Sequence, residues 1–237
     1  MVDKHNYSVH GFDWRITDYW NGRRYNQQEA RIMLLPDGES VFVIYTTRFF
    51  GNPLPPFTQM YGILRRNASN NEYIAGPPVW IDYERHLHTK NFVPFLYNDS
   101  VHLIPSFHPM VIIRLEAATD DGLNPVTLVH HQFNQPDAEG NQQPVTVPAY
   151  SLPWKEEYGI HIRGGTPALL VPSKDYYLLF FHTRQHGPAW GVDHYFMGAM
   201  TLCPHPPFHI RSMSRYPIVV DPLWYEGAWL NKVRTRD

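Results

Sequence analysis

Residues 166–183 (TPALLVPSKDYYLLFFHT) are the stretch that decides the fold. A short apolar segment, a turn of Pro, Ser, Lys and Asp, and a longer segment rich in aromatic residues together predict a β-hairpin. Two further apolar segments follow, at 194–202 and 209–213. The unit as a whole therefore predicts four short strands that follow one another along the chain.

The same order of short strand, turn and longer strand occurs twice before this unit. It runs over 29–46 (EARIMLLPDGESVFVIYT) and over 91–106 (NFVPFLYNDSVHLIPS). Weaker strands are expected after the first of these, at 61–65 and 73–81, and after the second, at 110–116. Repeated four-stranded units of about 40–50 residues are typical of a β-propeller, and longer spacings indicate loop insertions. We therefore expect an all-β chain with a propeller architecture.

The repeats predict one β-propeller domain over 1–237, with clear blades at about 28–86, 90–155 and 163–220. The polar stretch 134–143 predicts an exposed loop inserted in the second unit. Three units are too few to close a ring, which usually has 4–8 blades. Segments 10–25 and 223–237 are candidates for further strands, and the sequence leaves open whether the chain completes its ring.

Composition excludes several classes of protein. The formal net charge is −2, so no overall basic field favours nucleic acid or an anionic membrane. The single cysteine, Cys203, excludes an intrachain disulfide. No apolar run approaches the length of a membrane span, and residues 1–10 lack the apolar core of a signal peptide. A cytoplasmic location is therefore the expectation. An open ring would leave unpaired strand edges, so a homo-oligomer is also expected.

Polar residues gather where the expected inner strands begin, and in a propeller these positions converge on one central pocket. They are Glu29, Arg31, Lys90, Asn91, Arg163 and Thr166. The ends of the second strands add Thr46, Thr47, Arg48, Ser106, His108, His182 and Arg184. Cations bind phosphate, a carboxyl group can act as an acid, and polar groups bind sugar hydroxyls. The set therefore suits a sugar with an anion beside it. The adjacent Gly164 and Gly165 would permit a close approach of a ligand or of backbone.

Five segments resemble one family of five-bladed propellers. They are 90–95 (KNFVPF), 163–168 (RGGTPA), 181–183 (FHT), 195–199 (YFMGA) and 206–210 (PPFHI). These segments are similar to the β-mannoside phosphorylases and to related glycosyltransferase-like and glycosidase-like proteins of microbial eukaryotes and large viruses. The resemblance covers about 28–218. It implies an inverting attack of inorganic phosphate, as co-substrate, on β-mannosides or related glycans, with no metal and no other cofactor.

The resemblance also implies roles for single residues. The family segment Glu-Asp-Pro-Arg corresponds here to Gln28-Glu29-Ala30-Arg31. Glu29 thus stands where the family has its aspartate proton donor, with one methylene more and without the proline. Lys90 and Arg163 would bind phosphate or sugar oxygens, and Tyr195 would bind phosphate or pack against the sugar. Arg31, Asn91 and His182 are further expected pocket residues.

Three alternatives stay open beside an enzyme of this kind. One is a non-catalytic glycan-binding propeller, which the position of the Glu29 side chain would distinguish. Another is a sugar-nucleotide transferase, for which the sequence shows no motif that would hold the base. The third is a metal site built on His86 and His88, which would share one face of a strand, or on His182 and His186. No carboxylate stands at a characteristic spacing from these histidines, so no metal is expected.

Overall fold

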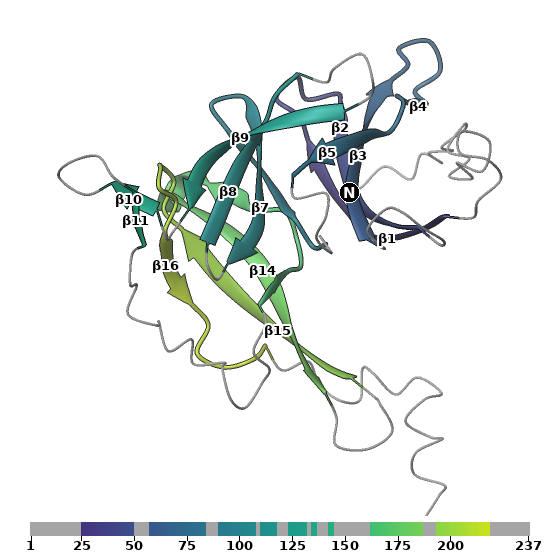
Figure 1. Ribbon diagram of the computed structural model, residues 1–237. Coiled ribbons are helices and arrows are strands. Elements are labelled where there is room, and N and C mark those ends of the chain that lie inside the picture. Colours follow the sequence, from purple (N-terminus) through teal and green to yellow (C-terminus); the bar gives the residue numbers. More distant parts are fainter. Residues whose placement is uncertain are drawn as a thin grey trace, which may run out of the picture.

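The computed structural model describes residues 25–49, 57–83, 90–107, 110–117, 123–131, 134–136, 142–144, 162–186 and 193–218. Within these ranges the chain consists of strands and connections, with one short 3-10 turn, η1 (Pro172–Lys174). The prediction of an all-β chain is thus confirmed for the described residues (Figure 1). No helix in these ranges is long and apolar enough to cross a membrane. The candidate strands at 223–237 and most of those at 10–25 lie outside the described residues.

The strands form three antiparallel meanders. The first meander consists of β1 (Tyr25–Leu34), β2 (Val41–Phe49), β3 (Phe57–Arg66), β4 (Tyr73–Ala75) and β5 (Val79–Asp82). The second consists of β6 (Val93–Tyr97), β7 (Ser100–Phe107), β8 (Met110–Leu115) and β9 (Leu123–His131). The third consists of β12 (Arg163–Gly164), β13 (Leu169–Val171), β14 (Tyr176–His186), β15 (Asp193–Leu202) and β16 (Ile210–Met213).

Different local devices make the first hairpin turn of each meander. Between β1 and β2, the side chain of Asp37 accepts hydrogen bonds from the amides of Glu39 and Ser40, and Gly38 adopts a φ of 71°. Between β6 and β7, Asn98 and Asp99 both have positive φ, as a two-residue turn of the hairpin type requires. In the third meander, η1 is followed by Asp175, which is left-handed with a φ of 50°. These turn residues are the ones that the sequence predicted.

Two features of the sheets differ from the sequence-based expectation. β5 and β9, the last strands of the first and second meanders, pair in parallel, so the two meanders form one nine-stranded sheet. The described strands form no closed ring. The stretch 134–143, predicted as a loop, contains a short ribbon of β10 (Asn134–Pro136) and β11 (Gln142–Pro144). Strands of three residues are too short for their pattern of polar and apolar residues to reveal them.

The meanders pack face to face through two apolar clusters. Phe42, Ile44 and Tyr61 of the first meander pack against Leu103 and Ile113 of the second. The opposite face of the second meander packs against the third meander in a second apolar cluster. The residues of this cluster include Phe95, Ile104, Ile112, Leu179, Phe181, Met200, Leu202 and Phe208. Burial of these large side chains is the main favourable contribution to holding the meanders together. The first strands of the three meanders, β1, β6 and β12, are thereby brought toward one another.

A pair of glycines tests this packing. A Cβ added at Gly198 would lie 2.4 Å from the ring of the fully buried Phe181, whereas one added at Gly62 would meet nothing within 4 Å. We expect Gly198→Ala to lower the free energy of unfolding by about 1–3 kcal/mol, because the core is overpacked. Gly62→Ala is the matched control and should leave it unchanged or raise it slightly. Urea unfolding followed by tryptophan fluorescence measures both, and equal effects would contradict the packing described.

Candidate functional site

The guanidinium of Arg31 connects all three meanders. Arg31 is 5% exposed, and its Nη1 donates to the carbonyl of Glu29 at 2.9 Å. Its Nη2 donates to Oδ1 of Asn91, which precedes β6, at 2.9 Å, and also to the carbonyl of Gly164 in β12. One side chain thus bonds to residues that come 60 and 133 positions later in the sequence. We call this arrangement the Arg31 clasp.

A β-bulge in β1 directs the Arg31 side chain toward Asn91 and Gly164 of the other two meanders. In β1, Gln28 pairs with Thr46 and Arg31 with Ile44, so Glu29 and Ala30 together stand opposite Tyr45. Glu29 has a φ of 58°, which is unusual for a residue that is not glycine. The left-handed conformation accompanies the bulge and lets the Glu29 carbonyl reach the guanidinium. Asn91 is also left-handed, with a φ of 65°. Such backbone conformations cost about 1–3 kcal/mol each and tend to cluster at functional sites.

Gly164 and Gly165 make room for backbone in this structure. A Cβ at Gly164 would lie 2.2 Å from the Val93 side chain and 2.5 Å from the Asn91 carbonyl oxygen. A Cβ at Gly165 would lie 2.9 Å from the carbonyl oxygen of Phe180. The glycines therefore let β12 approach the start of β6 and the middle of β14. This close approach brings the Gly164 carbonyl within reach of Arg31.

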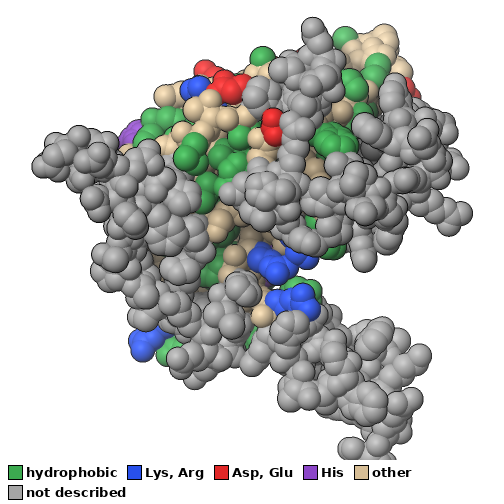
Figure 2. All heavy atoms as spheres, viewed as in Figure 1, with side chains coloured by type: hydrophobic (Ala, Val, Ile, Leu, Met, Phe, Trp, Pro, Cys, Tyr) green, Lys and Arg blue, Asp and Glu red, His purple; other side chains and the backbone are tan. Residues whose placement is uncertain are grey.

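Further cations surround the clasp. Lys90 is half-buried, and burial lowers its pKa; nearby Glu29 raises that pKa, while Arg163 and Arg184 lower it. Its ammonium also lies 5.2 Å from the centroid of the Phe57 ring. Burial likewise lowers the pKa of Arg31. Figure 2 shows Lys and Arg side chains gathered between the part of the molecule that holds β1 and the part that holds β14 and β15. We call Arg31, Lys90, Arg163 and Arg184 the cation cluster.

His182 lies among these cations as a neutral imidazole. It pairs in register with Arg163 of β12 and with Met197 of β15. Burial, followed by the charges of Arg31, Arg163 and Lys90, lowers the pKa of His182 to about 4. The centroid of its ring lies 5.9 Å from that of the exposed Tyr195. A neutral imidazole can donate one hydrogen bond and accept another.

Within the described ranges, little negative charge lies near Arg31 and Lys90. Glu29 is the only carboxylate there whose charge acts on Arg31 and Lys90, and its exposed side chain forms neither a hydrogen bond nor an ion pair with any described residue. Arg163 likewise forms no hydrogen bond or ion pair with a described residue. Nε of Arg31 and Nδ2 of Asn91 are buried donors without a protein acceptor. Buried donors of this kind are costly unless an acceptor reaches them. The site is therefore suited to an oxyanion.

Besides Arg184, the structure brings seven sequence-predicted residues into or beside this cluster. They are Glu29, Arg31, Lys90, Asn91, Arg163, His182 and Tyr195. Thr166 has another role, because its hydroxyl donates to the Pro167 carbonyl and accepts from the Phe180 amide. Sequence reasoning missed Phe57 as a cluster neighbour, since nothing in its local pattern separates it from a core aromatic residue.

The candidate residues at the ends of the second strands have different roles in the structure. Arg184 joins the cluster, where its charge lowers the pKa of Lys90. Thr46 and Thr47 are buried in the sheet, where they bond to Gln59 and Met60. Their hydroxyls therefore serve the packing of β2 on β3. His108 and the Arg48 side chain lie outside the described residues.

Both suggested metal sites include residues outside the described ranges. His86 and His88 lie outside the described residues, as does the side chain of His186. Among the residues that the structure describes, no group of three or more His, Cys, Asp and Glu side chains could hold a metal ion.

No protein-family model matches this chain, and no curated protein matches it.

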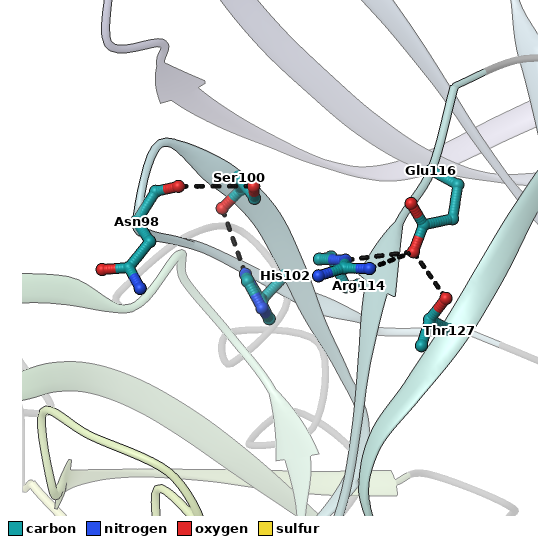
Figure 3. Close-up of polar contacts among 6 residues, drawn as sticks. All are labelled: Asn98, Ser100, His102, Arg114, Glu116 and Thr127. Carbon is teal, nitrogen blue, oxygen red and sulfur yellow. Dashed lines mark hydrogen bonds and ion pairs between the residues drawn. The ribbon is translucent and has the colours of Figure 1, made fainter.

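The Arg31 clasp predicts a large loss of stability on substitution. In Arg31→Met, the Asn91 Oδ1 and the Gly164 carbonyl lose their donor, so we expect unfolding free energy to fall by about 2–4 kcal/mol. Arg114→Met is the control. Figure 3 shows Arg114 bonded to Glu116, which also accepts from Thr127, on an exposed part of the second meander. That substitution should change stability little, since exposed ion pairs contribute little. Equal losses in urea unfolding would argue against the clasp.

The pKa of His182 should be strongly lowered. Its pKa of about 4 lies below the ordinary 6.5, so the unfolded chain binds a proton that the folded chain does not between these values. Its contribution to stability is therefore lost as the pH falls from about 6.5 to about 4. Lys90→Met should raise the pKa of His182, because one repelling charge is removed, and Lys174→Met at the exposed η1 should not. Histidine resonances followed by NMR against pH measure these values, and an ordinary pKa in the unsubstituted protein would refute the placement of His182.

Proposed function

We propose that this chain is a carbohydrate-active protein that binds inorganic phosphate at the cation cluster and uses it to cleave β-mannosides or related glycans. One observation carries the proposal. The charges of three cations, Arg31, Lys90 and Arg163, come from three meanders and act on a neutral His182, and within the described residues the Glu29 carboxylate forms no ion pair with them. Cations and aligned N–H donors in a partly buried site are what an oxyanion requires.

The resemblance in sequence suggests a β-mannoside as the substrate and a propeller as the architecture. We propose that the three meanders are blades of a five-bladed type of propeller, with β1, β6 and β12 as inner strands. The faces of successive meanders pack on each other, and the polar residues of the inner strands meet, as this architecture requires. The exposed ring of Tyr195 beside His182 offers an aromatic surface of the kind on which sugars pack.

In the proposed reaction, a phosphate oxygen attacks the anomeric carbon from the side opposite the glycosidic oxygen. The new bond between carbon and phosphate oxygen forms as the glycosidic bond breaks, so the anomeric centre is inverted. Glu29 in its acid form gives a proton to the departing sugar oxygen, either directly or through a substrate hydroxyl. Lys90 and Arg163 hold the phosphate, and His182 and Tyr195 assist. The products are mannose 1-phosphate and the shortened glycan, and no metal takes part.

The second candidate function is glycan binding without catalysis. It is favoured by the Glu29 carboxylate, which is exposed and makes no hydrogen bond with a described residue, although its charge acts on Arg31 and Lys90. A catalytic acid is usually oriented by a neighbouring group, and a misplacement of about 1 Å can lower the rate about 100-fold.

Phosphate-dependent release of mannose 1-phosphate from a panel of β-mannosides tests the proposal. We expect turnover that requires phosphate and falls at least about 100-fold in Glu29→Gln, which keeps the size of the side chain and removes the acid. Glu39→Gln, in the exposed turn between β1 and β2, is the control and should keep full activity. Saturable binding of sugar or phosphate without turnover would favour the glycan-binding function. Full turnover in Glu29→Gln would remove Glu29 from the acid role.

A further inference from the structure

Lys90 is held at the cation cluster against the repulsion of its neighbours. It precedes β6 and is half-buried, and burial and the charges of Arg163 and Arg184 all oppose its charged form. Glu29 favours this charge, but its exposed side chain forms no ion pair with Lys90. A lysine side chain is long and flexible, so its ammonium would leave such a position unless another contact held it.

The ring of Phe57 provides this contact. Phe57 begins β3 in the first meander and is half-buried. The ammonium of Lys90 lies over its ring, 5.2 Å from the centroid. A cation within about 6 Å of an aromatic ring is attracted by the negative face of the ring, and the attraction grows where water is partly excluded. The contact therefore stabilises the ammonium in a partly buried position where its cationic neighbours repel it.

An aromatic ring differs from a carboxylate in what it leaves to a ligand. A carboxylate in contact with Lys90 would neutralise its charge and would occupy its donors. The ring carries no net charge, so the charge of Lys90 remains for a bound anion. An ammonium has three N–H donors, and the ring covers one side of it. The donors on the other sides can therefore reach the oxygen atoms of an anion.

We propose that Phe57 is a positioning residue of the anion site, whose ring holds the ammonium of Lys90 within the cation cluster and leaves its charge for the bound oxyanion. The identity of that anion as phosphate rests on the proposed function, whereas the contact between ring and ammonium does not. Because the ammonium is in place before the anion binds, less rotamer freedom is lost on binding. The first meander thus contributes to the site through Phe57 as well as through Arg31.

Calorimetry with inorganic phosphate, together with NMR of isotope-labelled lysine side chains against pH, tests this role. Phe57→Leu keeps an apolar side chain and removes the ring, so we expect phosphate to bind about 3- to 10-fold more weakly. The same substitution should lower the pKa of Lys90 further, because the ring stabilises the charged form. Phe57→Tyr keeps an aromatic face and should retain both the affinity and the pKa. The Lys90 resonance is identified by its loss in Lys90→Met.

Tyr216→Leu is the matched control. It removes a ring that lies under the guanidinium of Arg215, whose Cζ is 5.5 Å from the ring centroid, and neither residue belongs to the cation cluster. The phosphate affinity and the pKa of Lys90 should both stay unchanged in this variant. Thermal unfolding followed by circular dichroism shows that each variant is folded.

An unchanged pKa of Lys90 or an unchanged phosphate affinity in Phe57→Leu overturns the proposal. So does a Phe57→Tyr variant that is impaired as strongly as Phe57→Leu, since an aromatic face would then not be what the site requires. If the unsubstituted chain binds no phosphate, the proposed function fails. The pKa of Lys90 in the two Phe57 variants then decides alone whether the ring holds the ammonium.

Discussion

A single buried guanidinium joins the three meanders of the described part of this protein. Arg31 bonds to the Glu29 carbonyl in its own strand, to Asn91 before the first strand of the second meander, and to Gly164 in the third. Apolar packing stacks the meanders, but it is not directional. The hydrogen bonds of Arg31 fix how the first strands of the meanders meet, because each acceptor has to lie close to the plane of the guanidinium, in line with an N–H bond. The bulge at Glu29 and the left-handed Asn91 are backbone features that accompany this geometry.

The same constraint gives the centre its charge. A buried Arg31 brings Lys90, Arg163 and Arg184 close enough for their charges to act on one another or on His182, and the described residues provide one weakly placed carboxylate against them. Proteins seldom keep like charges close together in a partly buried site, because desolvation and mutual repulsion are both costly. A bound anion would supply negative charge that compensates these cations. This is why the centre, and not the apolar faces, supports the proposal of a phosphate site.

Much of the fold could be predicted from the sequence because it depends on local patterns. The hairpin over 29–46, the Asn98-Asp99 turn and the strands of the third meander follow from alternating apolar residues and turn residues. The candidate site was also largely predictable, since Arg31, Lys90, Asn91, Arg163 and His182 all stand near the strand ends that the sequence of the repeated units predicts. The parallel pairing of β5 with β9 and the short ribbon of β10 and β11 were not predictable. The segments that pair in these two places are only three residues long, which is too short for a periodic pattern of polar and apolar residues.

The sequence by itself determined the class of the chain, its repeated strand order and the polar residues at the strand ends, because period and turn chemistry are properties of neighbouring residues. Only the tertiary structure decided how those residues are used. Thr166 looked like a ligand-binding hydroxyl, yet it bonds to the backbone around Phe180. Gly164 and Gly165 proved to accommodate neighbouring strands. Arg31 became a clasp because residues 60 and 133 positions away reach it. Contacts over such separations depend on how strands pack, and no local pattern encodes them.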